Sequence, residues 1–515
     1  MNVSRRFFIG SAASFGALGG CRLFTSNGYR DGGTPNLRFG VVSDIHIREV
    51  NKGDYRAEPH GGNATFRYTL EWFRDQNVDA VMIAGDMADL GMGEQLMAVA
   101  AAWYDVFPND RYPDGRPVEK VFVYGNHDWH GFGYGGGYAR KLYPDEREMV
   151  KHILQADMGG WWKKAFHEDY SPLYTKEIKG YTFIGQHWDR GCGYPKGDKG
   201  GIDPHTRLAK HLAEHGKSID PSLPFFYVQH PHPKDTVYGS WAWGHDNGSV
   251  TAALSAFPNA VAFSGHSHYS LTDERSVWQG SFTSVGTSSL RYTGMPYNER
   301  HPVGYENTTT ESRTPDRWKI DAVKMMRRFS TGDCRQGMLW SVYDDCMVVR
   351  RREFVTNLDV GDEWVIPLPS AESKPFAFAE RAKKFAAPRF VEGGKLQVSR
   401  VKAKNRGGKS EDGKRSLASV DKDAFRIDVP PAVADRHARL YELEFVAESK
   451  DGSKKTKYVM AVGYNHAEES ENAKSAQFCP FSLDELPKGE VRFSVTPMNC
   501  FHRRGEPLVS EWMRI

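Results

Sequence analysis

Five short apolar runs, rich in β-branched and aromatic residues, recur between residues 37 and 263, and polar residues follow each run closely. The runs cover residues 37–42, 80–84, 121–124, 225–228 and 261–263. Uninterrupted apolar runs of this length are typical of strands that are buried on both faces of a sheet. The pattern therefore predicts five buried strands, each with polar residues at its carboxyl end.

Helical patterns lie between these runs. Phe66, Leu70 and Phe73 recur at spacings of four and three residues, which places them on one face of a helix. Residues 205–215 are typical of a helix with a polar face. Buried strands alternating with amphipathic helices predict an α/β domain.

The pattern changes toward the carboxyl end of the chain. Residues 337–354 predict a hairpin that turns at Asp344 and Asp345, and residues 364–367 would add the last strand of the first domain. Residues 370–388, rich in Ala, Lys and Pro, read as a linker. We place the α/β domain at residues 37–369.

Beyond the linker the apolar positions alternate with a period of two. Tyr441, Leu443 and Phe445 alternate with glutamates, and residues 491–495 repeat the pattern. Residues 389–515 therefore predict a small antiparallel β-sandwich, which resembles a fibronectin type III module. We interpret the basic run at residues 400–415 as a solvated loop.

Composition restricts the class of protein rather than its activity. The chain has 515 residues, 39% of them hydrophobic, and a formal net charge of +3. This length allows two or three domains with large cores. The small net charge provides no signature of nucleic-acid binding, and oligomeric state is not predicted.

The amino terminus resembles an export signal. Arg5 and Arg6 lie in a twin-arginine pattern, and a weakly apolar stretch follows, so residues 1–20 read as a twin-arginine signal peptide. Cys21 then occupies the position of a lipidated first residue, with residues 21–36 as a tether. We expect an exported protein in the periplasm or cell envelope, anchored through this lipid only. The alternative is an ordinary cleaved signal with an incidental cysteine.

Five further cysteines remain, so at least one is unpaired within a monomer. Export would permit disulfide formation, and Cys479 with Cys500 is the plausible bridge.

Metal-binding side chains follow the five predicted strands. Ser-Asp-Ile-His, Ala-Gly-Asp, Gly-Asn-His-Asp, Gln-His-Pro-His and Gly-His-Ser-His contain seven candidate ligands: Asp44, His46, Asp86, Asn126, His230, His266 and His268. Strand ends in α/β folds converge at one edge of a sheet. Within Asp44/His46 and His266/His268, residues two apart would point the same way from an extended backbone. Carboxylates and imidazoles from separate segments suit a pair of divalent ions.

These motifs, in this order, resemble the calcineurin-like metallophosphoesterase superfamily. The resemblance implies an αββα sandwich and a dinuclear centre of Mn, Fe or Zn. One ion would be held by Asp44, His46 and His268, the other by Asn126, His230 and His266, with Asp86 bridging both. A hydroxide that bridges the ions would attack phosphorus. His232 is a less favoured alternative to His230.

The same resemblance implies roles for residues near the ligands. His127 would contact the phosphoryl group and act on the leaving oxygen, and Asp89 would hydrogen-bond His127 and raise its pKa. Asp89 as a helix cap is the alternative. Asp128 would hold the loop. Arg48 and His130 are candidate substrate contacts.

Three inserts are expected to shape the substrate pocket, and their aromatic residues would either stack on a substrate or pack the loops together. They begin near Trp129, after His230 and near Tyr292, and their other named side chains are Trp241, Trp243, His245, Tyr297, His301 and Tyr305.

The motif details favour one branch of the superfamily. Asp89 stands where purple acid phosphatases carry Tyr, and Ile47 stands where phosphoprotein phosphatases carry Gly. The chain is closer to class III cyclic-nucleotide phosphodiesterases and their bacterial relatives. We expect a small phosphate ester or a nucleotide-like substrate, a diester rather than a monoester. The alternative is a catalytically degenerate, surface-binding lipoprotein that acts through its β-sandwich.

Overall fold

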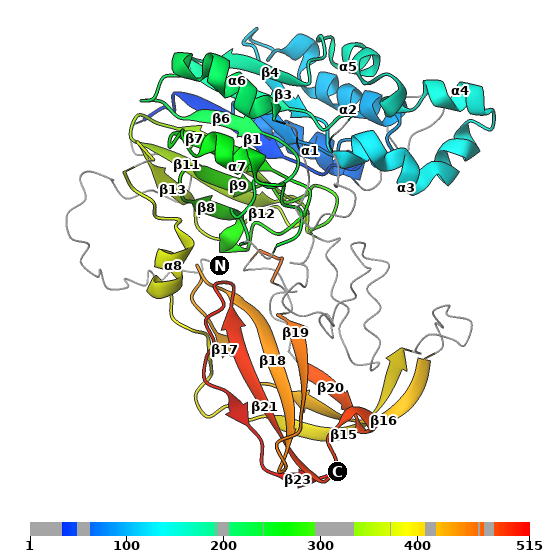
Figure 1. Cartoon of the computed structure of the whole chain (residues 1–515), viewed down its shortest axis with the longest axis vertical. Coiled ribbons are helices and arrows are strands. Elements are labelled where there is room, and N and C mark those ends of the chain that lie inside the picture. Colours follow the sequence, from blue (N-terminus) through cyan, green and yellow to red (C-terminus); the bar gives the residue numbers. More distant parts are fainter. Residues whose placement is uncertain are drawn as a thin grey trace, which may run out of the picture.

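The computed structural model describes an α/β domain followed by an all-β domain (Figure 1). The described residues are 33–48, 62–190, 192, 204, 206–239, 242–293, 334–370, 372–406, 419–461, 464–467 and 478–515. The predicted signal peptide and Cys21 lie outside this set, as do Trp241, Tyr297, His301 and Tyr305. None of the helices in the described part is long and apolar enough to cross a membrane.

The first sheet of the α/β domain has seven strands in the order β12-β11-β10-β1-β2-β3, with β13 paired to β11. Its strands β1, β2 and β3 are parallel, whereas β10 joins β1 antiparallel. The strands are β1 (Leu37–Val42), β2 (Ala80–Ala84), β3 (Glu119–Val123), β10 (Gln336–Val342), β11 (Cys346–Glu353), β12 (Leu358–Asp359) and β13 (Trp364–Pro367). The predicted hairpin at residues 337–354 is confirmed as β10 and β11.

The second sheet has six strands in the order β4-β5-β6-β7-β9-β8. Strands β5, β6, β7 and β9 are parallel to one another, and β4 and β8 add antiparallel edges. The strands are β4 (Leu173–Ile178), β5 (Tyr181–Gln186), β6 (Phe225–Val228), β7 (Ala260–Ser264), β8 (Val277–Gln279) and β9 (Thr283–Gly286).

The two sheets pack face to face around an aromatic centre. The Phe39 ring is 4.9 Å from that of Phe226, across the interface, and 5.9 Å from that of Trp340 in its own sheet. Helices cover the outer faces: α1 (Gly62–Asp75), α2 (Gly93–Val106) and α5 (Met158–Phe166) on the first sheet, α6 (Arg207–His215) and α7 (Ser249–Leu254) on the second. Strands inside and helices outside confirm the predicted α/β sandwich. The central strands β2, β6 and β7 are buried throughout because both faces of each sheet are covered.

Helix α3 (Asn126–Leu142) spans the Gly-rich run that we expected in a pocket insert. Glycine disfavours helix, but Asp128 in the first turn accepts a hydrogen bond from the Gly125 amide at 2.7 Å. This contact satisfies an amide that a helix start would otherwise leave exposed. Helix α4 (Glu146–Lys151) follows.

The C-terminal domain consists of two antiparallel sheets, β15-β16-β20 and β19-β18-β21-β22, with β23 paired to β21. The bounds are β15 (Gln397–Arg406), β16 (Ser419–Asp428), β18 (Leu440–Ser449), β19 (Lys454–Met460), β20 (Phe478–Ser482), β21 (Glu490–Asn499), β22 (Leu508–Val509) and β23 (Met513–Arg514). Side chains of both sheets, including Phe445, Phe481 and Phe493, share one buried cluster. The short pair β14 (Arg389–Phe390) and β17 (Ala432–Val433) and helix α8 (Phe378–Lys384) complete the described elements of this half.

Two expectations for this half were wrong. Residues 400–406 of the basic run are not a loop: they belong to β15, which pairs with β16 along its whole length, so backbone pairing prevails over their charge. Cys479 and Cys500 are not joined by a disulfide. They lie in two different hydrophobic clusters, and so they do not form the bridge we expected.

Candidate metal centre

All seven predicted ligands follow strands that end at the same side of the two sheets. Asp44 and His46 follow β1, Asp86 follows β2 and Asn126 follows β3, whereas His230 follows β6, and His266 and His268 follow β7. The backbone after these strands is not extended as expected. Left-handed φ angles occur at Asp44 (51°), His46 (48°), Asp86 (54°), His266 (71°) and His268 (58°). This conformation is costly for residues other than glycine, and it is concentrated at functional sites.

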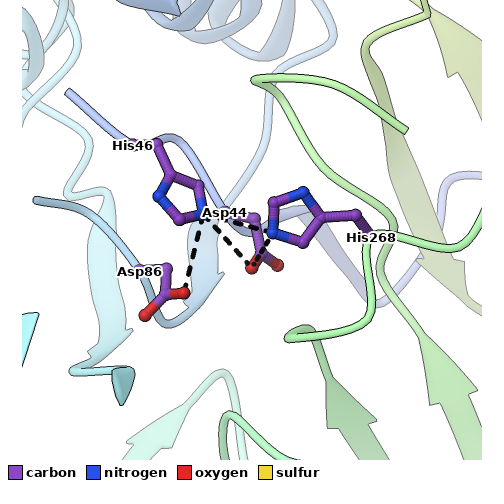
Figure 2. Close-up of side chains that lie close together, drawn as sticks. All are labelled: Asp44, His46, Asp86 and His268. Atoms are coloured by element: carbon purple, nitrogen blue, oxygen red, sulfur yellow. Dashed lines mark hydrogen bonds and ion pairs between the residues drawn. The ribbon is translucent and has the colours of Figure 1, made fainter. Parts of the chain in front are cut away.

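Figure 2 shows the first group of converging side chains, formed by Asp44, His46, Asp86 and His268. The Nε2 atoms of His46 and His268 are 3.1 Å apart. Oδ1 of Asp44 lies 2.9 Å from Nε2 of His268, and Oδ2 of Asp86 lies 3.6 Å from Nε2 of His46. All four side chains are buried.

The second group shares Asp86 with the first and adds His230 and His266. Nε2 of His230 is 3.1 Å from Oδ2 of Asp86 and 3.2 Å from Nδ1 of His266. Oδ1 of Asn126 lies 3.0 Å from the same Nε2 atom. Asp86 therefore stands between two groups of donors, the position that the sequence assigned to a bridging ligand.

Backbone carbonyls orient two of the imidazoles. Nδ1 of His230 donates to the carbonyl of Ala84 at 2.7 Å, and Nδ1 of His268 donates to that of Tyr292 at 3.1 Å. A proton held on Nδ1 leaves the Nε2 lone pair directed at the other donors. Metal-binding histidines in proteins are commonly oriented in this way.

The charges of the centre fit divalent cations. Burial lowers the pKa of His46, but hydrogen bonds to Asp44 and Asp89 and the charge of Asp86 outweigh burial and raise it to about 10. Burial likewise lowers the pKa of His230, and the charge and hydrogen bond of Asp86 reverse this and raise it to about 9. Without metal the buried carboxylates thus draw protons onto the imidazoles. Cations between the donors would replace those protons, and nitrogen atoms facing each other at about 3 Å suit shared coordination.

Asp89 contacts a different histidine from the one we expected. Its Oδ1 atom accepts a hydrogen bond from Nδ1 of His46 at 2.9 Å and lies 3.6 Å from Nδ1 of His127. His127 instead donates from Nδ1 to the backbone carbonyl of Asp89 at 2.8 Å. Burial lowers the pKa of His127, and the charges of Asp86 and Asp89 do not reverse this. The carboxylate of Asp89 therefore orients the metal-binding candidate His46. Its charge raises the pKa of His127, as predicted, but burial outweighs that effect and the net shift is downward.

Asp128 holds the first-sheet loops together. It accepts hydrogen bonds from the amides of Gly125, Met87 and Ala88, at 2.7, 3.3 and 2.7 Å. It is completely buried. The segment after β2 and the start of α3 are thereby joined behind Asp86 and Asn126.

The two predicted substrate contacts lie at the margin of the centre. Arg48 is 54% exposed in its side chain, and its Nε lies 3.3 Å from Oδ2 of Asp89. His130 lies in the first part of α3, half-buried, with its ring 6.5 Å from that of Trp188. His232 is buried between the hydroxyls of Ser264 and Ser267, both 2.7 Å from its ring nitrogens, and so it has a structural role.

Aromatic side chains surround the second-sheet ligands. The Trp243 ring stacks on His266 at 4.4 Å, Tyr292 lies 4.5 Å from His268, and Trp188 lies 5.9 Å from His266. The sequence analysis did not single out Trp188, because no ligand motif marks it. Its position just after β5, a neighbour of β6 in the second sheet, could have identified it.

A family model described as calcineurin-like phosphoesterase matches residues 37–270. Similar solved structures include a dimetal phosphatase from Danio rerio, 13% identical over 65% of this chain and 99% of that one, with a TM-score of 0.32. A purple acid phosphatase from yellow lupin seeds is 14% identical over 66% of this chain and 56% of its own, with a TM-score of 0.39. Identities this low carry no information about substrate. No curated protein matches the sequence.

Proposed function

Because residues 37–270 match the calcineurin-like phosphoesterase family model, we propose that this protein is a dinuclear metal-dependent hydrolase of phosphate esters. The observation that carries the proposal is the pair of buried donor groups that share Asp86. A catalytically degenerate scaffold would have no reason to retain both groups with their orienting hydrogen bonds.

The first ion would be held by Asp44, His46 and His268 and the second by Asn126, His230 and His266, with Asp86 contacting both. Two bound divalent ions supply Lewis-acid activation of water and neutralise charge on a phosphoryl group. A mixed oxygen and nitrogen donor set without sulfur suits Mn, Fe or Zn.

His127 is the candidate to act at the leaving oxygen. Its backbone amide donates to Oδ1 of Asp86 at 2.8 Å, which fixes the residue beside the shared ligand. With Nδ1 bonded to the Asp89 carbonyl, proton exchange with a substrate falls to Nε2. The negative charge of a bound phosphate ester would oppose the effect of burial and favour the protonated ring.

A phosphodiester, as in class III cyclic-nucleotide phosphodiesterases, is the favoured substrate. Arg48 is the candidate cation for the phosphate, and its charge is already partly neutralised by Asp89. This pairing suits a monoanionic diester better than a dianionic monoester. Trp243 and Tyr292 lie where they would contact the organic group of a small or nucleotide-like ester.

The proposed test compares the purified protein with Asp86→Asn, using bis-p-nitrophenyl phosphate and p-nitrophenyl phosphate and measuring metal content on the same samples. Loss of the shared carboxylate should lower turnover on the order of 10³-fold, the scale of removing one major source of transition-state stabilisation. Asp169→Asn, whose side chain is 89% exposed, is the matched control and should retain full activity. Neither ester being hydrolysed after reconstitution with Mn, Fe and Zn would favour the alternative, a surface-binding protein acting through its β-sandwich.

Export and lipid anchoring are a separate proposal, supported by Arg5, Arg6 and Cys21 in the sequence. Cell fractionation tests it. Replacing both arginines by lysine should retain the protein in the cytoplasm, whereas Cys21→Ala should release exported protein from the membrane fraction. Unchanged membrane association of Cys21→Ala would remove the lipid anchor from the proposal.

A further inference from the structure

A short segment of the C-terminal domain, residues 464–467, reaches back to the α/β domain. The backbone carbonyl of Asn465 accepts a hydrogen bond from Nε2 of Gln336 at 2.9 Å, and the carbonyl of Tyr464 accepts one from Thr272 at 2.5 Å. The Ala467 amide donates to Oε2 of Glu353 at 3.0 Å. Figure 1 shows the C-terminal sandwich below the α/β domain, so this segment joins two separately folded bodies.

Three metal-binding side chains meet at this junction, and the phosphoesterase mechanism uses none of them. Cys334 and Glu353 come from the open end of the β10–β11 hairpin, where Gln336 pairs with Glu353, and His466 comes from the C-terminal segment. Sγ of Cys334 is 3.2 Å from Nδ1 and 3.5 Å from Nε2 of His466. One ligand atom from each of the three residues lies within 4.8 Å of the others.

Burial distinguishes this group from a catalytic triad of thiol, imidazole and carboxylate. Cys334 and Glu353 are 0% exposed and His466 is 2% exposed, so a substrate has no access to the thiol. The carboxylate oxygens of Glu353 accept hydrogen bonds from Thr356 at 2.8 Å and from the Ala467 amide at 3.0 Å, and Gln336 adds another. A carboxylate has about four lone-pair sites, so Glu353 retains capacity for a further partner.

The ligand chemistry differs from that of the dinuclear centre. A thiolate with an imidazole and a carboxylate suits a borderline-soft ion, and zinc is bound in proteins by these three groups. One further donor, such as water, would complete four-coordination. Because two ligands belong to the α/β domain and one to the C-terminal domain, an ion here would join the two.

We propose that Cys334, Glu353 and His466 form a structural zinc site that fastens the C-terminal domain to the catalytic domain. The site is independent of the proposed reaction, because it shares no ligand with the dinuclear centre. An inactive protein that still holds zinc through Cys334 would refute the proposed function and leave this site intact.

Cobalt substitution of the full-length protein is the direct test, because thiolate ligation gives a charge-transfer absorption in the near ultraviolet. The ligands assigned to the dinuclear centre include no cysteine, so this band reports a thiolate ligand outside that centre. We expect the band in the wild type and in Cys346→Ser, a matched control at another buried cysteine. We expect its loss in Cys334→Ser and His466→Ala, with a fall of one zinc per chain and retained phosphoesterase activity.

Absence of the band in cobalt-loaded wild type, with equal zinc content in all four proteins, would overturn the proposal and leave a hydrogen-bonded thiol–imidazole contact. The wild-type spectrum decides this even where a variant fails to fold. A band that persists in soluble Cys334→Ser would assign the thiolate to another cysteine and equally overturn the site.

Discussion

The two sheets of the α/β domain contribute different chemistry to one metal centre. The first sheet supplies Asp44, His46, Asp86 and Asn126, and thus every carboxylate among the seven candidate ligands. The second sheet supplies only imidazoles: His230, His266 and His268. Each proposed ion takes ligands from both sheets, so neither edge is a metal site by itself.

This division means that the first sheet carries the charge and the second completes the coordination. The buried carboxylates of the first sheet repel each other until cations or protonated histidines neutralise them. The raised pKa values of His46 and His230 show that these carboxylates favour protonated imidazoles when no cation is bound. Metal binding should therefore depend more on the ligands of the first sheet. Binding of both proposed ions should depend on correct packing of the two sheets.

The largest effect should come from removing charge at the first sheet. Asp44 and His268 are assigned to the same ion and contact each other at 2.9 Å. Asp44→Asn should lower kcat/KM on the order of 10³-fold, whereas His268→Gln, which removes no charge, should lower it on the order of 10²-fold. Steady-state kinetics with metal analysis on both variants would check this, and equal losses would contradict the division between the sheets.

Close contact between the sheets gives the next largest effect. A Cβ atom at Gly85, in the first sheet's loop, would lie 2.3 Å from Nδ1 of His230 in the second, and the φ of Gly85 is +92°. Gly85→Ala must therefore displace this imidazole and its hydrogen bond to the Ala84 carbonyl. We expect a loss of activity on the order of 10²-fold together with reduced metal content, on the scale of losing a ligand's orienting contact.

Gly137→Ala is the control for that substitution, because nothing lies within 4 Å of a Cβ atom there. It should leave both activity and metal content unchanged. A fully active Gly85→Ala enzyme would mean that the sheets tolerate a shift between them.

Substitution of Asp89 should have a smaller effect on activity. It would show whether Asp89 acts through His46 or through His127. If it acts through His46, as the 2.9 Å hydrogen bond indicates, Asp89→Asn should weaken metal affinity by about 10- to 100-fold. Excess metal would then restore most of the turnover. If it acts through His127, kcat should remain low at saturating metal, with metal affinity unchanged. Metal titrations of activity distinguish the two outcomes.

Local patterns predicted the strands and the candidate ligands because each motif is a strand and the polar residue next to it. The apolar run at residues 80–84 and the adjacent Asp86 need no knowledge of the rest of the chain, and β2 was accordingly predicted with its observed bounds. The α/β sandwich followed from the same alternation of buried strands and helices.

Other features depend on contacts between distant segments, and the sequence does not encode these locally. The partner of Asp89 is decided by the relative positions of two imidazoles, one after β1 and one after β3. Strand β15 includes basic residues because pairing with β16 outweighs their preference for solvent. The group of Cys334, Glu353 and His466 has no sequence spacing to reveal it, because its third member lies in another domain.

The smallest effect on turnover is expected from a carboxylate that lies behind the second sheet's imidazoles. Asp246 accepts hydrogen bonds from Nε2 of Gln229 at 3.0 Å and from the Lys234 and Gly248 amides at 3.1 and 2.8 Å, and so it holds the loop that follows His230. Burial outweighs these hydrogen bonds and raises its pKa to about 6. Unlike the first sheet's carboxylates, it is assigned to no ion.

The sign of its contribution follows from that shift. Between about pH 4 and pH 6 the folded protein binds the Asp246 proton more tightly than the unfolded chain does, so this group's stabilisation is lost as pH rises through that window. The loss is about 3 kcal/mol, from roughly two pKa units at about 1.4 kcal/mol each. Asp246→Asn cannot titrate, so the difference in free energy of unfolding between wild type and variant should shift by about 2 kcal/mol between about pH 4.5 and about pH 7, because part of the window lies below pH 4.5. Urea unfolding at both pH values measures it, with the exposed Asp169→Asn as control. A constant difference would show that Asp246 is ionised throughout, and that buried charge behind the second sheet is tolerated as it is in the first.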